Sequence, residues 1–148
     1  MEISARTIPQ AWSMVEVDIS DLVAFRNSIK EVFFLREGIR LTYLPFIAKI
    51  LIQTLGEFPL LNSSWGEDRI ILKNSVHLGI ATDTPFGLMV PVLHQTEGLG
   101  VTEIAHSIHS MVNRARENEL TLDEVQGGTF TLNNTGVLGS ITSQPLIN

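Results

Sequence analysis

The sequence predicts a mixed α/β domain in which helices pack against a sheet. Residues 20–38 and 102–117 repeat apolar side chains at the spacing of one helix face, and a stretch that starts near Thr42 is apolar almost throughout. Short β-branched runs lie between and after these stretches, separated by turns that contain Pro and Gly. Because helices and strands do not alternate regularly, the order does not predict a doubly wound Rossmann sheet.

The composition sets limits on the kind of protein. A chain of 148 residues is long enough for one domain with a real core, and its 44% apolar and 18% charged residues are typical of a globular protein. The net charge of -6 argues against nucleic acid as a partner, because phosphate binding needs clustered Lys and Arg. The absence of cysteine excludes a disulfide scaffold, a thiolate zinc site and a cysteine nucleophile, and it fits a reducing compartment.

Neither a signal peptide nor a membrane span is predicted. The first ten residues lack an apolar signal core. The longest apolar stretch, Leu44 to Leu55, is interrupted by Pro45, Lys49 and Gln53 and is too short to cross a bilayer. We therefore expect no association with a membrane.

The first elements are a strand and a helix. Residues 12–20 alternate with period two, which predicts a strand with one wet face; its apolar side carries Val15, Val17 and Ile19. Ser20 is the expected N-cap of the helix that follows, and Gly38 marks its end.

The second helix carries only a narrow polar stripe of Lys49, Gln53 and Glu57. Pro45 is tolerated in its first turn, where the amide has no partner inside the helix. So narrow a wet face predicts that this helix lies mostly buried, against a sheet.

The rest of the chain follows the same rules. Residues 58–69 read as a loop, and strands are predicted at 70–74, 76–82 and 88–94, the last two joined by the turn "DTPFG". A third helix spans Thr102 to Glu117. Residues 121–128 form a connector, and "TFTLNN" is a strand that leads into a loop.

Most candidate sites are weak. "GLGVTE" lacks the later glycine and the preceding strand of a dinucleotide fingerprint. His106 and His109 have a spacing that can bind metal, but without converging carboxylates we interpret them as surface residues. His77 is expected to be a packed or hydrogen-bonded strand residue. His94 opens "HQTEG" at a strand end, where a catalytic role has no nucleophile nearby in the sequence.

The stretch "GGTFTLNNTGVLGS" at residues 127–140 carries more chemistry. Its asparagine amides are uncharged donors that can meet a developing oxyanion. The competing interpretation is turn formation alone, because Asn and Gly favour loops and satisfy local backbone groups.

Four segments, taken together, are similar to those of a known family. They are "IPQAWSMVEVDISDL", "FPLLNSSW", "LGIATDTPFGLMVPVLH" and "GGTFTLNNTGVLGS". In this order and spacing they resemble the catalytic domain of the dihydrolipoyl acyltransferase core component of 2-oxo acid dehydrogenase complexes, and most of all its bacterial branched-chain type. The resemblance covers essentially the whole chain.

The resemblance implies a fold like that of chloramphenicol acetyltransferase, in trimers that build a hollow multienzyme core. The implied reaction moves an acyl group from the lipoyl arm to coenzyme A in a channel between subunits. A histidine of one subunit removes the thiol proton, and a hydroxyl near the neighbour's Thr-Phe-Thr strand meets the oxyanion. Coenzyme A and lipoyl-lysine are substrates, and no cofactor is tightly bound.

The implied partners are the lipoyl domain, the decarboxylase and dihydrolipoamide dehydrogenase. The implied location is the bacterial cytoplasm, or the mitochondrial matrix if the parent is eukaryotic. Carried onto this chain, the implied catalytic residues are Asn133, Asn134 and Thr135, and the substrate-binding ones are Thr129, Thr131 and Gly136. Many members have serine at the position of Asn133, but an amide donates as a hydroxyl does, and the bacterial branched-chain relatives also read Asn.

The family's histidine motif, in which Asp-Gly follows three residues after His, does not occur in these 148 residues. We therefore expect residues 1–148 to be a partial catalytic domain, without lipoyl and subunit-binding modules, that does not catalyse the transfer alone. Open sheet edges would make it an obligate oligomer or bind it to a partner. The alternatives are a non-catalytic core or assembly module with the same fold and an unrelated coenzyme A-binding protein.

Overall fold

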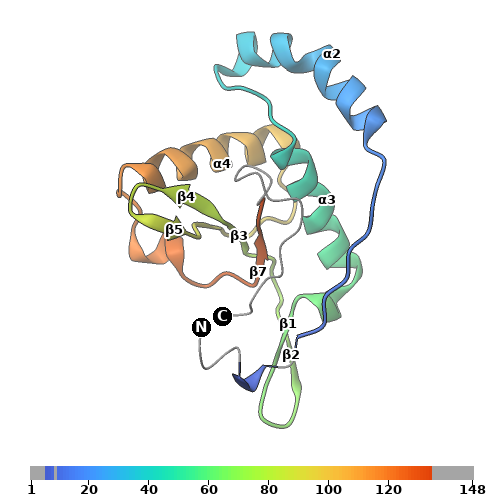
Figure 1. The fold of residues 1–148 in the computed structure, drawn as a ribbon, viewed down its shortest axis with the longest axis vertical. Coiled ribbons are helices and arrows are strands. Elements are labelled where there is room, and N and C mark those ends of the chain that lie inside the picture. The colour runs from blue at the N-terminus through green and yellow to red at the C-terminus, as the bar shows by residue number, and fades with distance from the viewer. Residues whose placement is uncertain (1–5, 9, 135–148) are drawn as a thin grey trace.

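The structure is a computed structural model that describes residues 6–8 and 10–134. Its centre is formed by two helices, α3 (Leu44–Glu57) and α4 (Val101–Arg116), which pack against each other beside a small mixed sheet (Figure 1). A third helix, α2 (Ser20–Glu37), lies apart from this centre at one end of the molecule. The predicted class, helices packed on a mixed sheet, is confirmed.

The core fills the space between the two central helices and the sheet. Its buried members from the helices are Ala48, Ile52, Leu55, Ile104, Ile108 and Met111, and they meet Leu78 and Ile80 of the sheet. α4 therefore buries the face that its apolar spacing predicts. α3 was predicted to lie mostly buried, but it is buried on one side only: Ile47 and Ile50 remain 42% and 58% exposed, so a second apolar face of α3 is open to solvent.

The sheet contains β3 (Leu78–Ile80) between two partners. β6 (Val92–Leu93) runs antiparallel to it, and β7 (Phe130–Leu132) runs parallel to it, with Gly79 opposite Thr131. β7 thus joins the sheet from a position far along the chain, after α4 and a connector. This placement brings Asn133 and Asn134, which follow β7, next to the start of α3.

The predicted "DTPFG" turn joins β4 (Thr82–Thr84) to β5 (Gly87–Met89) in an antiparallel hairpin. The Thr84 hydroxyl accepts a hydrogen bond from the amide of Phe86 at 3.1 Å and donates one to the carbonyl of Gly87 at 2.7 Å. Gly87 has φ 107°, a backbone conformation that favours glycine. The turn prediction is confirmed.

The loop predicted at residues 58–69 is wrong in part. It contains the 3₁₀ turn η1 (Pro59–Leu61) and the strand β1 (Ser63–Trp65), which pairs with β2 (Ile70–Leu72) in a hairpin that projects from the body (Figure 1). Buried Asn62 closes the base of this hairpin. Its side-chain N–H group donates to the main-chain carbonyl of Ser75, and its main-chain carbonyl accepts from the amide of Lys73. The turn-forming residues of this stretch do not reveal these contacts, because they join Asn62 to residues that follow β2.

The strand predicted at residues 12–20 is also wrong. Residues 11–19 pair with no strand in the described part of the chain, and Val15 and Val17 are 78% and 72% exposed. The alternation is real, but a strand needs a main-chain partner as well as a pattern. The expected cap differs too: the carboxylate of Asp18 accepts from both the amide and the hydroxyl of Ser20, which lowers the pKa of Asp18.

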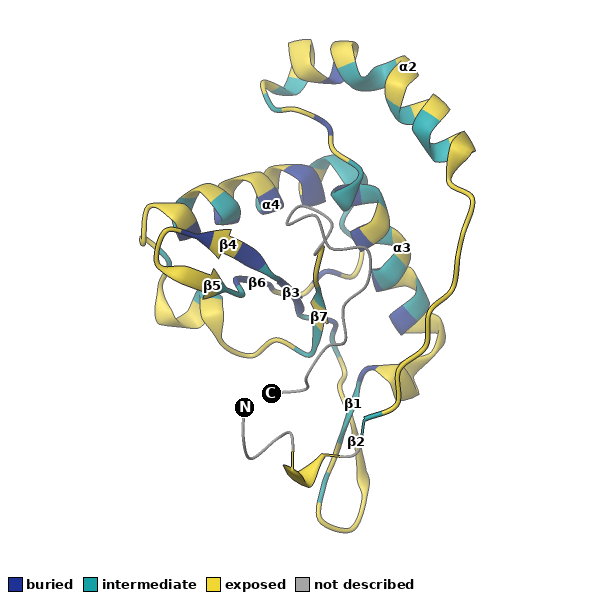
Figure 2. Cartoon of the chain, in the orientation of Figure 1, coloured by how far each residue is buried: buried dark blue, intermediate teal, exposed yellow. Residues whose placement is uncertain are grey.

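α2 ends as predicted at Gly38, which has φ 74° and donates its amide to the carbonyl of Phe34. Phe33 and Leu41 form a second small cluster with Ala105 of α4. Figure 2 shows that much of α2 is coloured as exposed. Its exposed residues include the large apolar side chains of Phe25, Val32, Phe34 and Leu35. In the described residues no helix combines the length and the apolarity that a bilayer crossing requires.

Candidate functional site

The candidate site lies at the end of β7. His77, which lies just before β3, fixes the start of β7. Its main-chain carbonyl accepts hydrogen bonds from the amides of Thr129 and Phe130 at 2.8 and 3.3 Å. At the other end the carbonyl of Leu132 accepts from the amide of Ala81 at 3.0 Å. The strand is thus held at both ends, and it delivers Asn133 and Asn134 to a defined place beside the sheet.

Asn133 and Asn134 line a cavity of about 710 Å³. Its walls come from the start of α3, from β3 and β4, and from one face of α4. Most of the wall is apolar, with Ile80, Leu88, Ile108, Val112 and Leu132 among its residues. Polar and charged side chains also contribute to the lining, so the cavity combines an apolar wall with groups that can fix the orientation of a ligand.

The charged residues of this cavity are mainly cations. Arg40 precedes α3 and Arg116 ends α4, and both contribute to the lining, as does the carboxylate residue Asp83 of β4. All three are exposed at the surface of the chain. Two guanidinium groups beside an apolar wall can receive an anionic ligand that also carries a hydrophobic part.

His109 also lines the cavity, but one of its nitrogens is engaged. The side-chain amide of Asn113, one helical turn further along α4, lies 3.1 Å from His109 Nε2. An amide N–H that donates to Nε2 leaves the proton of the neutral ring on Nδ1. In this arrangement Nε2 of His109 is not free to act as a base.

The structure separates the residues that the resemblance pointed to. Asn133 and Asn134 come together in the cavity. The hydroxyl of Thr129 is engaged between β7 and the residue before β3, because it accepts a hydrogen bond from the amide of His77 at 3.0 Å. Thr131 is exposed on β7 opposite Gly79, and Thr135 and Gly136 lie outside the described residues.

His106 lies outside the lining of the cavity and contacts α2. His106 Nε2 lies 2.9 Å from a carboxylate oxygen of Glu37, and this contact joins α4 to the end of α2. The hydrogen bond from His106, followed by one from Arg36, lowers the pKa of Glu37. No group of three His, Asp or Glu side chains in the described ranges is placed to hold a metal ion.

The sequence reasoning missed the cationic side of the cavity. His109, Asn113 and Arg116 share one face of α4, at spacings of four and three residues. That spacing is visible in the sequence, but nothing in it shows that this polar face turns toward Asn133. Arg40, between α2 and α3, has no sequence signal of its own.

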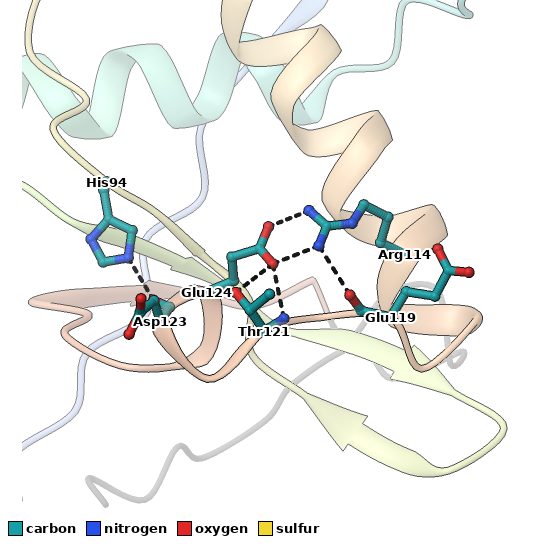
Figure 3. A network of polar contacts seen from close by, with 6 residues as sticks. All are labelled: His94, Arg114, Glu119, Thr121, Asp123 and Glu124. Atoms are coloured by element: carbon teal, nitrogen blue, oxygen red, sulfur yellow. Dashed lines mark hydrogen bonds and ion pairs between the residues drawn. The ribbon is translucent and has the colours of Figure 1, made fainter.

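The connector before β7 is tied to the end of α4 (Figure 3). It forms a 3₁₀ turn, η2 (Leu122–Val125), whose Glu124 carboxylate receives both the Arg114 guanidinium and the amide and hydroxyl of Thr121. The hydrogen bonds from Arg114 are the main reason why the pKa of Glu124 falls to about 2. This network sets the path of the chain into β7.

Comparison with known proteins gives relatives over the full chain. The profile of the family described as 2-oxoacid dehydrogenases acyltransferase (catalytic domain) matches residues 1–148. The lipoamide acyltransferase component of the branched-chain alpha-keto acid dehydrogenase complex of Bacillus subtilis is 44% identical over 148 residues, which cover 100% of this chain and 35% of that protein. The dihydrolipoyllysine-residue acetyltransferase component of the pyruvate dehydrogenase complex of the same organism is 40% identical over 147 residues, or 98% of this chain and 33% of that protein.

Solved structures agree with the sequence relatives. A probable dihydrolipoamide acetyltransferase from Listeria monocytogenes superimposes with a TM-score of 0.95 at 41% identity, covering 99% of this chain and 63% of that one. The cubic core of the pyruvate dehydrogenase multienzyme complex superimposes with a TM-score of 0.93 at 32% identity, covering 99% of this chain and 60% of that one.

The chain spans about a third of the length of the curated relatives it matches. The family profile nevertheless matches this chain from its first residue to its last, and the Listeria structure covers 99% of it. This chain therefore belongs to the 2-oxoacid dehydrogenase acyltransferase (catalytic domain) family.

Proposed function

We propose that this chain forms part of a site that transfers an acyl group from S-acyl-dihydrolipoyl-lysine to coenzyme A within a 2-oxo acid dehydrogenase complex. The observation that carries the proposal is the position of Asn133 and Asn134, which end β7 in a cavity that also contains two arginines. The similarity to the branched-chain lipoamide acyltransferase component of Bacillus subtilis supports a branched acyl group.

The reaction needs a base, hydrogen-bond donors for an oxyanion, and a proton for the leaving sulfur. A base removes the proton of the coenzyme A thiol, and the resulting thiolate attacks the carbonyl carbon of the lipoyl thioester. The carbonyl electron pair moves onto oxygen, where preplaced donors stabilise the charge. When the tetrahedral intermediate collapses, the new thioester forms and the lipoyl sulfur leaves with the electron pair of the broken bond and takes up a proton.

Asn133 and Asn134 supply the donors in this proposal. Each side-chain amide has two N–H groups and carries no charge, so it can meet an oxyanion without first forming an ion pair with the substrate. Both residues are exposed to the cavity and follow directly on a strand that is fixed at each end. A donor held by a rigid strand loses little energy to reorganisation when the charge develops.

Arg40 and Arg116 fit the other substrate. Coenzyme A carries phosphate groups at one end and a thiol at the other, joined by a less polar arm. Two guanidinium groups can bind the phosphates, and the apolar wall of Ile80, Ile108 and Leu132 can accept the arm and the acyl chain. Because Nε2 of His109 is engaged by Asn113, we assign the base to a histidine of a neighbouring subunit.

The exposed apolar residues of α2 and of the β1–β2 hairpin support assembly into a trimer and then into a larger core. Similarity to the cubic core of the pyruvate dehydrogenase complex supports the same arrangement. The partners in the proposal are the lipoyl domain, the decarboxylase and the dihydrolipoamide dehydrogenase, and the bacterial relatives support a cytoplasmic location.

Titration calorimetry with coenzyme A tests the proposal on the 148-residue chain. We expect saturable binding that weakens about tenfold in Arg116→Gln, because a hydrogen bond to a charged group contributes roughly 1.5 kcal/mol. Arg69→Gln is the matched control, since Arg69 lies on the exposed β1–β2 hairpin. A folded chain that binds no coenzyme A would reject the proposal and favour the non-catalytic assembly module.

A further inference from the structure

Arg26 of α2 holds the short segment that joins α2 to α3 (Figure 1). Its Nε donates a hydrogen bond to the main-chain carbonyl of Leu41 at 2.8 Å. Its guanidinium carbon lies over the ring of Tyr43, 5.1 Å from the ring centre, a distance at which a cation and an aromatic ring attract each other. One side chain of α2 therefore contacts this segment at two points, directly before α3 begins.

The segment that Arg26 holds is part of the wall of two cavities. Thr42 and Tyr43 line the larger one, of about 710 Å³, which contains the proposed acyl-transfer site. Leu41 lines a smaller cavity of about 520 Å³ beside α2, and Arg40 lines both. Arg26 lines only the smaller cavity, so it can influence a ligand in the larger one only through the segment or through its charge.

The backbone of the segment has little other support. Within the described part of the chain, residues 39–42 form no hydrogen bond between main-chain groups. The carbonyl of Leu41 is bonded to Arg26, and the side chain of Leu41 is buried against Phe33 and Ala105. Leu41 is thus the residue through which the segment is attached to the rest of the molecule.

The two attachments of Leu41 have different effects. The buried side chain anchors the Cα atom, whereas the hydrogen bond to the carbonyl restricts rotation of the following peptide about the Cα–C bond. The neighbours Arg40 and Thr42 are exposed, so packing of their own side chains does little to order them. Because an unsupported backbone gains conformational entropy, loss of the bond to Arg26 should make both neighbours mobile.

We propose that Arg26 is a positioning residue of the acyl-transfer site: it orders residues 40–43 so that Arg40 is held ready for the phosphate end of coenzyme A. The consequence for coenzyme A rests on the function proposed above. Arg26 takes no part in making or breaking bonds and does not touch the substrate. A cation that is already ordered loses less conformational freedom when it binds a phosphate, so Arg26 strengthens binding at a distance.

The competing explanation is that Arg26 acts through its charge alone. Arg26, Lys30 and Arg40 give the smaller cavity three cations against the single carboxylate of Glu31, and cations attract an anionic ligand without contact. Two uncharged substitutions separate the explanations. Glutamine places an amide nitrogen where arginine has Nε and can donate to the carbonyl of Leu41, whereas methionine has a similar length and no donor.

Nitrogen-15 relaxation of the backbone tests the positioning role without a ligand. In the wild type and in Arg26→Gln, the amides of Arg40 and Thr42 should have order parameters of about 0.85, as in rigid backbone; in Arg26→Met they should fall below about 0.6. Lys30→Met is the matched control, because it removes a cation from the same cavity and leaves the bond to Leu41 in place. Its order parameters should equal those of the wild type.

The proposal is overturned if Arg26→Met leaves these order parameters unchanged, or if Arg26→Gln lowers them as much as Arg26→Met does. A loss of the same size in Lys30→Met would also overturn it, since the order of the segment would then depend on charge and not on the hydrogen bond.

Titration calorimetry with coenzyme A measures the consequence for the site. Arg26→Met should weaken binding about fivefold, and Arg26→Gln by less than about twofold. Equal losses in the two variants would favour the charge explanation and overturn the proposal. If Arg26 acts through Arg40, the double variant Arg26→Met with Arg40→Gln should lose less than the product of the two single factors. Factors that multiply would show that the two residues act independently.

The two measurements fail separately. If the folded chain binds no coenzyme A, the proposed function is rejected, and the order parameters still decide whether Arg26 positions the segment. If coenzyme A binds with equal affinity to the wild type and Arg26→Met, the proposed function stands and the positioning role is rejected.

Discussion

Arg114 and Glu124 form a two-pronged ion pair that joins the last turn of α4 to η2. One nitrogen, Nη2, donates to Glu124 Oε2 at 2.7 Å, and Nη1 contacts Oε1. The same Nη2 donates to the carbonyl of Glu119 at 3.0 Å, so the pair also closes the turn between the two elements. A bidentate contact of this kind fixes direction as well as distance, and it orients the connector that enters β7.

Stability should therefore depend on pH through Glu124. Its pKa is lowered from 4.5 to about 2 in the folded chain, chiefly by Arg114, so the folded state favours the carboxylate. The resulting stabilisation is fully present above pH 4.5 and is lost as the pH falls toward 2. Urea unfolding across this range should show a smaller loss in Glu124→Gln than in the wild type, while Glu117→Gln should follow the wild type. The prediction would be contradicted if the free energy of unfolding fell equally with pH in the wild type, Glu124→Gln and Glu117→Gln.

Ile104 tests the core between α4 and the sheet. Its side chain is completely buried, at 0% exposure, and truncation leaves a cavity that rigid neighbours can fill only in part. Ile104→Ala should lower the free energy of unfolding by about 2–5 kcal/mol. Ile50→Ala, at a 58% exposed position of α3, should change it by less than about 1 kcal/mol. Chemical denaturation measures both, and similar losses would mean that the core lies elsewhere.

Gly79 tests the packing at the centre of the sheet. A Cβ at this position would lie 2.9 Å from Cγ1 of Val90 and 3.4 Å from Oγ1 of Thr131. Gly79→Ala should therefore cost about 1–3 kcal/mol through overpacking. Adding Val90→Ala removes the closest atom, so the double variant should lose less than the sum of the two single changes. Strict additivity in denaturation experiments would show that no such contact exists.

The apolar surface of α2 tests the proposed assembly. Leu35 is 84% exposed in the isolated chain, and a leucine buried at an interface contributes roughly 1.5–3 kcal/mol. Leu35→Glu should weaken self-association about tenfold or more in sedimentation equilibrium. Leu122→Glu changes another exposed leucine, 67% open on η2, and should leave the association unchanged. An unchanged association in Leu35→Glu would place the interface away from α2, and an equal loss in Leu122→Glu would show that the effect is not specific to α2.

Much of the fold could be predicted from the sequence because the relevant forces are local. The apolar spacing of α4, the left-handed Gly38 and the turn at residues 83–87 each depend on neighbours within a few positions. The strand expected at residues 12–20 failed because alternation specifies a face and not a partner. The β1–β2 hairpin was missed because its base is closed by buried Asn62, whose role depends on contacts with Lys73 and Ser75.

The candidate site was only half visible in the sequence. Clustered amides after a β-branched run pointed to Asn133 and Asn134, and both line the cavity. Arg40 and Arg116 are separated from them by long stretches of chain, and only the packing of α4 beside the sheet brings the groups together.

The parallel pairing of β3 with β7 has a consequence for synthesis on the ribosome. His77 and Thr129, which immediately precede these strands, are 52 residues apart. At about 5–20 residues per second, roughly 3–10 s pass between the emergence of one and of the other. During that interval one edge of β3 lacks its strand and can pair with a nascent neighbour, so slow translation between α4 and β7 should favour co-translational misassembly.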